Sequence, residues 1–117
     1  MEELKQRAIQ SAMEIFGCEA GSLLLYDHEK EELFFDVALG SKGEKVKTYR
    51  LKLGEGIAGY VALHKQPEIV NDVSQDPRFL RKVDEMTGFN TVNMLCVPLM
   101  FKGKIQGVLQ VLNKRDE

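Results

Sequence analysis

The residues able to do chemistry in this chain are few, and their spacing argues against catalysis and metal binding. The chain holds two histidines, His28 and His64, and two cysteines, Cys18 and Cys96. Neither histidine has a cysteine or carboxylate at ligand spacing on its own element, and no C-x-x-C or H-E-x-x-H motif occurs. Cys96 stands among apolar residues of an expected strand, where a cysteine is a small core hydrophobe rather than an activated nucleophile. We therefore expect no metal, no cofactor and no enzyme activity.

One glycine pair stands where the start of a helix is suited to an anion. Gly54 and Gly56 open an expected helix over residues 56–64. Its first backbone N–H groups and its positive dipole end suit a phosphate or a carboxylate. The alternative is a helix start that needs only close packing against a sheet. The local sequence alone favours this alternative, because helix starts greatly outnumber anion sites.

Other polar residues stand where either a ligand or a structural partner would use them. Asp84, Thr87 and Thr91 surround the end of an expected helix and the loop after it. Gln106 and Gln110 are expected on one side of a strand otherwise suited to burial. A buried glutamine needs a hydrogen-bond partner, which backbone, water or a ligand can supply.

The elements that position these residues follow from hydrophobic periodicity. Helices are expected over residues 2–16, 56–64 and 76–87, and the last begins at Asp76-Pro77 with Asp at the cap and Pro at the first helical position. Strands are expected over residues 21–27, 33–39, 48–53, 68–70, 93–101 and 104–112. Because the strands come in hairpin pairs, the sheet is expected to be antiparallel, in an α+β domain.

Two of these elements have faces that the pattern predicts in detail. On the first helix, one apolar face is expected to hold Leu4, Ala8, Ile9, Ala12, Ile15 and Phe16. On the second strand, alternation puts Leu33, Phe35, Val37 and Leu39 on one face, and Phe34, Asp36 and Ala38 on the other.

Composition excludes several classes of protein. The 117 residues suffice for one domain with a real core. The net charge of −2 and the pI near 5.7 give no strong field to recruit nucleic acid or an acidic membrane. No apolar run approaches the roughly 20 residues of a membrane span. Two cysteines are too few for a disulfide framework and indicate a reducing compartment, so we expect a cytoplasmic protein.

Three segments together resemble the GAF domain family in the right order over nearly the whole chain. They are GCEAGSLLLYD (17–27), LKLGEGIAGYVALHKQPEIVNDVSQDPRF (51–79) and VDEMTGFNTVNMLCVPLMFKGKIQGVLQVLNK (83–114). The T-G-F-x-T-x-N-M-L-C-V-P segment and the pair Asn113-Lys114 are most similar to the subtype found in cyclic nucleotide phosphodiesterases and adenylate cyclases. The resemblance implies a six-stranded antiparallel sheet in the order 3-2-1-6-5-4, flanked by helices, with a small-molecule pocket on one face.

The resemblance also unites the scattered polar residues into one ligand site. Its floor would hold Ser22 and Gln110, and its roof Ile57 and Ala58 through backbone groups near an anion. Its lid would hold Asp84, Thr87 and Thr91.

The chain departs from the family pattern in three places. Ala38 and Leu39 stand where nucleotide-binding members often carry an aromatic-acid pair, and Gln110 stands where a glutamate is common. After Asn113-Lys114 the chain ends at residues 115–117 without the phenylalanine and the closing C-terminal helix of the family. We therefore expect residues 1–117 to be a single GAF domain that is a fragment of a longer signalling protein.

The resemblance implies a non-catalytic sensory domain. It would bind a small cytosolic ligand, a cyclic nucleotide or a similar anion, and control an output domain in the same chain. A homodimer is expected, with neither a nucleic-acid nor a membrane partner. The alternative is a dimerisation module with a vestigial pocket. A third reading is sulfoxide reduction, which some relatives perform with cysteines near the pocket; two distant cysteines argue against it.

Overall fold

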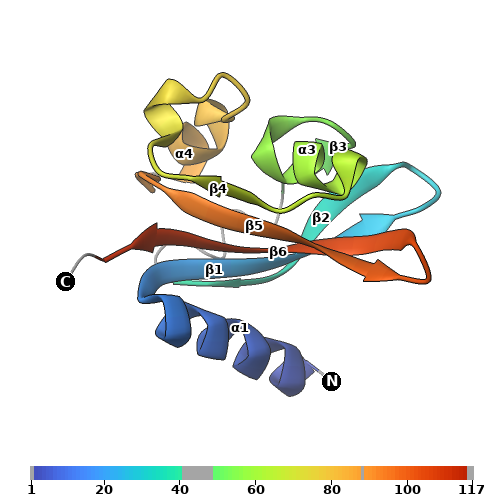
Figure 1. Ribbon diagram of the computed structural model, residues 1–117, viewed down its shortest axis with the longest axis horizontal. Helices are drawn as coiled ribbons and strands as arrows, with labels where there is room; N and C mark the ends of the chain where they lie inside the picture. Colours follow the sequence, from blue (N-terminus) through green and yellow to red (C-terminus); the bar gives the residue numbers. More distant parts are fainter. Residues whose placement is uncertain (1, 41–48, 88, 116–117) are drawn as a thin grey trace.

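The computed structural model describes residues 2–40, 49–87 and 89–115, and in them an antiparallel sheet separates two helical layers (Figure 1). Six strands form it, in the order β3-β2-β1-β6-β5-β4. Their bounds are β1 Cys18–Asp27, β2 Glu32–Leu39, β3 Arg50–Lys52, β4 Glu68–Val70, β5 Met94–Phe101 and β6 Lys104–Lys114. Helix α1 (Glu2–Phe16) covers one face, and α3 (Gly56–His64) and α4 (Arg81–Thr87) lie over the other. The α+β class, the antiparallel sheet and the strand order are confirmed.

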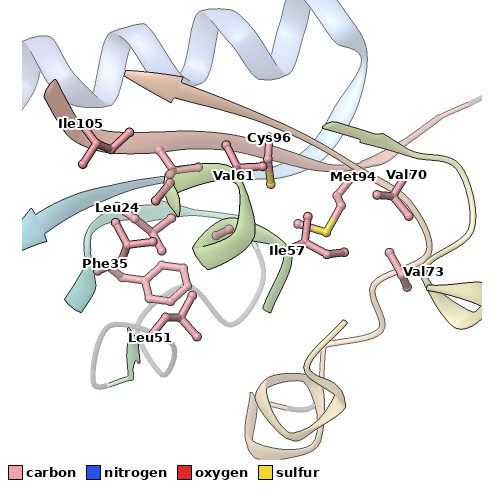
Figure 2. Packing of buried hydrophobic residues seen from close by; sticks show 14 residues of the cluster. Leu24, Phe35, Leu51, Ile57, Val61, Val70, Val73, Met94, Cys96 and Ile105 are labelled. Atoms are coloured by element: carbon pink, nitrogen blue, oxygen red, sulfur yellow. The ribbon is translucent and has the colours of Figure 1, made fainter. Parts of the chain in front are cut away.

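The hydrophobic core lies between the sheet and α3 (Figure 2). Leu24 of β1, Val108 of β6 and Val61 of α3 are completely shielded from solvent and meet there. The apolar residues of α3 that are buried against the sheet are Ile57, Ala58, Val61 and Ala62. In the part of the chain that the structure describes, no helix is long and apolar enough to cross a membrane.

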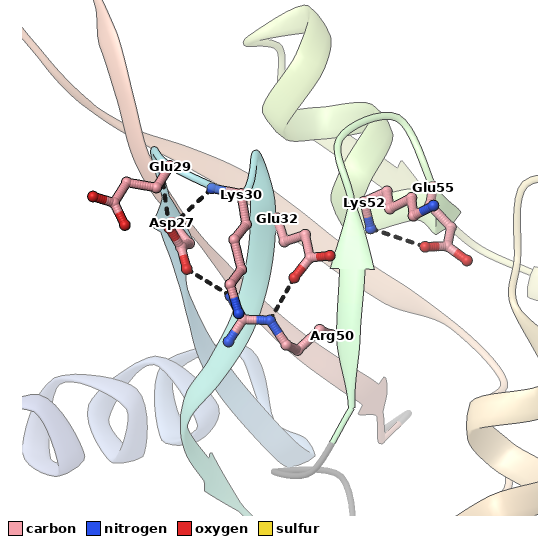
Figure 3. A network of polar contacts seen from close by, with 7 residues as sticks. All are labelled: Asp27, Glu29, Lys30, Glu32, Arg50, Lys52 and Glu55. Carbon is pink, nitrogen blue, oxygen red and sulfur yellow. Dashed lines mark hydrogen bonds and ion pairs between the residues drawn. The ribbon is translucent and has the colours of Figure 1, made fainter.

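The edge strand β3 is held to the sheet by ion pairs of Arg50 as well as by the buried side chain of Leu51 (Figure 3). Arg50 donates from Nε to Glu32 Oε1 at 2.6 Å and from Nη2 to Asp27 Oδ2 at 2.8 Å. Hydrogen bonds from the backbone N–H groups of Lys30 and Glu29 in the turn, together with the Arg50 guanidinium, hold the pKa of Asp27 below its usual value. The guanidinium thus joins β3 to the β1–β2 hairpin.

The bounds of α1 are as predicted, but only part of its predicted apolar face is buried. Ile9 is buried, whereas Leu4 and Ile15 are exposed. A side chain at Gly21 of β1 would lie 2.9 Å from both Ile9 Cγ2 and Met13 Cγ, so the helix rests directly on the backbone there. This close contact sets how α1 is rotated and turns Leu4 and Ile15 outward.

A β-bulge makes the predicted alternation along β2 wrong beyond Phe35. The β1–β2 register pairs Leu24 with Phe35, but Leu23 with Val37, so Asp36 is an extra residue. A bulge of one residue reverses the face of everything after it. Val37 is therefore buried outside the main core cluster, on the α1 side, while Ala38 joins the α3 side.

A second bulge explains why Gln106 does not accompany Gln110. Leu99 pairs with Gly107 and Met100 with Ile105, so Gln106 is skipped in the ladder and exposed. Ile105 takes its place in the core. The expectation that both glutamines lie on the buried side is therefore wrong for Gln106.

The helix predicted over residues 76–87 begins five residues later, at Arg81. A short 3-10 helix, η1 (Val73–Gln75), comes first, and the Asp76 carboxylate accepts from Arg78 N and Nε, both at 2.9 Å, instead of capping a helix. Arg78 also donates to Glu68 at 3.1 Å and stacks over the Tyr60 ring at 4.5 Å. The hydrogen bonds that Arg78 donates to the Asp76 carboxylate lower the pKa of Asp76. Arg78 thus holds the segment that precedes α4 against β4 and α3.

Candidate ligand-binding site

A cavity of about 100 Å³ lies between the sheet and the layer formed by α3 and α4. Six of the seven site residues predicted from the sequence line it: Ser22, Ile57, Ala58, Asp84, Thr91 and Gln110. The seventh, Thr87, ends α4, and its side chain lies outside the described residues. The structure thus brings the six together from β1, α3, α4, β6 and the loop before β5, while their roles toward a ligand stay predictions.

The floor of the cavity lies along a row of paired residues across four neighbouring strands, of which Gln110, Ser22 and Ala38 line the cavity. Cys96 of β5 pairs with Gln110 of β6, which pairs with Ser22 of β1, which pairs with Ala38 of β2. Cys96 Sγ donates to Gln110 Oε1 at 3.4 Å, and burial raises the pKa of this thiol far above its usual value. Ser22 is 5% exposed and Gln110 7%. Within the described ranges, no hydrogen bond reaches Ser22 Oγ or Gln110 Nε2, so both polar groups are available to the cavity.

The roof is the start of α3, and its N–H groups have no side-chain cap. Glu55 occupies the N-cap position but makes no capping bond, because its Oε1 accepts from Lys52 N at 2.8 Å. Gly56 has φ of 71°, and a Cβ there would lie 3.0 Å from Leu80 Cδ1. A glycine is therefore needed both for the backbone turn and for the close approach of the lid. No side chain therefore caps the first N–H groups of α3, and anion binding there stays a prediction.

The lid is closed by a hydrogen-bonded pair of predicted site residues. The Asp84 carboxylate of α4 accepts from Thr91 N at 2.7 Å and from Thr91 Oγ1 at 2.8 Å. The loop carrying Thr91 is held in turn by Asn113, whose Oδ1 accepts from Val92 N at 2.6 Å. Asp84 and Thr91 therefore join the lid helix to the loop before β5.

Sequence reasoning missed the aromatic part of the lining. Phe35, Phe79 and Phe89 contribute to the cavity wall. The β1–β2 bulge sets which β2 residues reach the cavity, and Phe79 was assigned to a helix that begins only at Arg81. Nothing in the sequence around Phe79 and Phe89 indicates that they line a cavity. Apolar residues at such positions could equally well pack on a hydrophobic core.

The two cysteines lie in different environments, and neither is activated. Cys18 begins β1 opposite Lys114, and partial burial raises the pKa of its thiol. Cys96 is fully buried in the core. A reactive cysteine needs a lowered pKa and access to solvent. Among the described residues, no group of three or more histidine, cysteine or acidic side chains is placed to hold a metal ion.

Removing the lid contact is expected to loosen α4 without unfolding the sheet. In Asp84→Ala, the N–H and the hydroxyl of Thr91, a residue that is 8% exposed, lose the carboxylate to which they donate, at a cost of about 1–3 kcal/mol confined to the lid. Amide hydrogen exchange in residues 81–87 should accelerate while residues 95–99 stay protected. Glu85→Ala, at an exposed neighbour on the same helix, is the matched control. Uniform acceleration across the domain would contradict a local role.

A sheet with one terminal helix on one face and a cavity on the other is the architecture of a class of small α+β domains. The chain belongs to the GAF domain family, whose description matches residues 1–117 and whose members are generally regulatory rather than catalytic. Among curated proteins it is 31% identical over 119 residues to the probable 3',5'-cyclic phosphodiesterase pde-5 of Caenorhabditis elegans. The match covers 94% of this chain but 16% of that relative, and it supports the phosphodiesterase subtype.

Solved structures share the fold. The GAF domain of a phosphoenolpyruvate-protein phosphotransferase from Coxiella burnetii superposes with a TM-score of 0.86 at 23% identity, over 96% of this chain and 66% of that chain. The A. aeolicus nlh2 GAF domain in an inactive state superposes with a TM-score of 0.81 at 20% identity, over 100% of this chain and 70% of that chain. A free methionine-R-sulfoxide reductase from Neisseria meningitidis, in complex with its substrate, superposes with a TM-score of 0.76 at 21% identity, over 92% of this chain and 59% of that chain. At these identities the likeness shows the fold alone.

Proposed function

We propose that this GAF domain is a cytoplasmic sensor that binds a small ligand with an anionic end and controls an output domain in the same chain. One observation carries the proposal. A cavity between the sheet and α3 presents polar groups from two sides, the uncapped N–H groups at the start of α3 and the side chains of Ser22 and Gln110. Among the described residues no fully buried side-chain nitrogen or oxygen lacks a hydrogen-bond partner, so solvent reaches these side-chain groups, and a ligand would replace that water with direct hydrogen bonds.

The proposed switch is a shift in population between lid states. The Asp84–Thr91 pair closes α4 over the cavity, and Arg78 clamps the chain that leads into it. A ligand that contacts both roof and floor stabilises the closed state over open ones. The end of β6, held to the lid loop by Asn113, would pass the change to the chain beyond the domain.

A cyclic nucleotide is one candidate within this ligand class. The curated relative is named a probable cyclic phosphodiesterase, which supports considering it. Ala38 and Leu39 offer the base no stacking, although Phe79 and Phe89 supply aromatic surface elsewhere in the wall. The cavity is partly open to solvent and measures about 100 Å³, below the roughly 300–1,000 Å³ of ordinary ligand pockets, so a nucleotide would have to displace the lid further.

Ligand binding is expected to raise the melting temperature of the domain. A panel of cyclic nucleotides, other nucleotides and small carboxylates should contain a compound that stabilises the fold by about 2.7 kcal/mol at 100 times its Kd. Thermal shift measurement detects this. Thr91→Val, which loses the hydroxyl bond to Asp84, should weaken the same ligand by loosening the lid. A panel without any shift would favour the alternative function.

The alternative is a dimerisation module, and the outer face of α1 favours it. Leu4 and Ile15 are eleven residues apart, so they share one side of the helix, and they are 61% and 76% exposed. Exposed apolar surface of this kind is often buried in the interface of a dimer. Sedimentation velocity should show a concentration-dependent dimer that Ile15→Lys abolishes and Gln10→Lys, at another exposed position of α1, does not. A monomer at high concentration would remove this function and the expected homodimer.

A further inference from the structure

We infer that Gln110 selects the ligand of this cavity by presenting amide N–H donors, so that the ligand end facing the sheet carries a carbonyl oxygen and not an amino group. Cys96 is the positioning residue that sets the direction of this amide. The selected class is therefore an anion whose other end is a ketone, amide or ring carbonyl. This ligand class rests on the proposed sensory function of the same cavity.

The thiol of Cys96 is a fixed hydrogen-bond donor beneath the cavity. Cys96 is completely shielded from solvent, and its burial raises the pKa of the thiol far above its usual value. The sulfur therefore keeps its proton, and it donates to Gln110 Oε1 at 3.4 Å. Turning the amide round would take this acceptor away from the thiol and place an N–H group against sulfur, which is only a weak acceptor.

The direction of the Gln110 amide follows from this bond and from the strand register. Cys96 of β5 and Ser22 of β1 are the neighbours of Gln110 on its two sides in the sheet. The oxygen and nitrogen of an amide diverge from one carbon, so Nε2 is directed away from Cys96 when Oε1 is directed toward it. The N–H donors of Gln110 therefore lie on the Ser22 side, where both residues line the cavity.

The polar atoms of Gln110 and Ser22 reach the cavity although both residues are buried. Gln110 is 7% exposed and Ser22 5%, and within the described ranges no hydrogen bond reaches Gln110 Nε2 or Ser22 Oγ. In the same part of the chain, every fully buried side-chain nitrogen or oxygen has a partner. Solvent therefore reaches these two atoms through the cavity that they line. A ligand group placed there must replace the hydrogen bonds of that water.

Only an acceptor can replace those hydrogen bonds at Gln110. Its Nε2 offers donors alone, whereas the Ser22 hydroxyl either donates or accepts. A carbonyl oxygen can accept from both, but a ligand amino group would meet the amide of Gln110 donor to donor and leave it unpaired. Sites with buried hydrogen-bonding groups reject a ligand that lacks the matching group. The uncapped N–H groups of α3 offer donors at the roof, where the anionic end is proposed.

Isothermal titration of the 117-residue chain with oxo acids tests this selection. Because the cavity is partly open to solvent, the test uses a ladder of lengths, namely 4-oxopentanoate, 5-oxohexanoate and 6-oxoheptanoate. Each is compared with the isostere in which a methylidene group replaces the ketone oxygen. At the best length the ketone should bind about tenfold more tightly. This preference should vanish in Gln110→Met and persist in Gln106→Met, a matched change at the exposed glutamine of the same strand.

The positioning role of Cys96 has its own tests. Cys96→Ala should reduce the preference for the ketone severalfold, because the amide is then free to turn. Cys96→Ser, whose hydroxyl still donates to Gln110 Oε1, should keep it. In the unliganded protein, nuclear Overhauser effects from the Gln110 side-chain amide protons should be stronger to the β-protons of Ser22 than to those of Cys96. The reverse order would overturn the inference even if the Cys96 variants fail to fold.

The possible outcomes separate this inference from the function on which it rests. Binding of cyclic AMP, which carries no carbonyl group, with no heat from any oxo acid would overturn the ligand class and leave the sensory function standing. Equal binding of ketone and isostere, or a preference that survives Gln110→Met, would overturn the selection by Gln110. A full preference in Cys96→Ala would overturn the positioning role. No binding by any compound, with no thermal shift, would overturn the inference and the proposed function together.

Discussion

Replacing Gly107 with alanine is expected to prevent stable folding of the domain. A Cβ at this position would lie 2.3 Å from the carbonyl oxygen of Leu24, a backbone atom in the middle of the neighbouring strand β1. Because β1 and β6 are the central pair of the sheet, neither can move aside without disturbing the core on both faces. Overpacking against a side chain costs roughly 1–3 kcal/mol, and against backbone at least about 3 kcal/mol is expected, a large share of the stability of a small domain.

Urea unfolding followed by circular dichroism measures this loss. The matched control is Gly103→Ala in the β5–β6 turn, where φ is 77° but no atom lies within 4 Å of the added Cβ. That variant carries only the conformational cost of a left-handed alanine, about 1 kcal/mol. Equal losses in the two variants would show that backbone conformation, and not the contact with Leu24, makes glycine necessary at position 107.

Asn113→Ala is the second large expected effect, and it should reach the cavity as well as the fold. The side chain is a buried hub: Oδ1 accepts from Val92 N at 2.6 Å and from Asn93 N at 3.3 Å. Nδ2 donates to Glu19 Oε1 at 3.0 Å and to Asn90 O at 2.9 Å. Alanine would leave backbone groups of the lid loop unpaired, at a cost of about 3 kcal/mol or more.

Two variants at the same position separate the causes. Asn113 has φ of 60°, which asparagine and glycine tolerate better than alanine. Asn113→Gly fits this backbone but lacks the side-chain bonds, so it should be nearly as unstable as Asn113→Ala and should lose ligand-induced thermal stabilisation. Recovery of wild-type stability in Asn113→Gly would show that strain, not hydrogen bonding, accounts for the loss. Lys114→Ala, an exposed neighbour, should leave the fold unchanged.

Local patterns in the chain were enough to predict most elements of the fold. The helix bounds 2–16 and 56–64, the strand 68–70 and the break at 102–103 between the strands predicted over 93–101 and 104–112 all agree with the structure. In each case the signal is short-range: periodicity along one element, or glycine in a left-handed turn. The strand order came from resemblance to a family, because no local pattern specifies which strands become neighbours.

Local patterns were not enough to predict the site. Gly56 and Gln110 carry a signal in the sequence, but it was the resemblance to the GAF family that united the six predicted residues that line the cavity. The hydrogen bonds between Asp84 and Thr91 and those of Asn113 join residues from separate elements. Only the folded chain brings these partners within bonding distance.

Tertiary structure alone decided which faces the residues occupy. The bulges at Asp36 and Gln106 reverse the inward and outward positions after them, and each depends on the partner strand rather than on its own sequence. The Asp76-Pro77 pair has the pattern of a helix start, yet Arg78, Glu68 and Tyr60 together hold it in a turn. Leu4 and Ile15 satisfy the period of a buried face, but the contact of Ile9 with Gly21 turns them to solvent. Periodicity thus determined what each segment can form, and long-range packing chose among the faces and ends that periodicity allows.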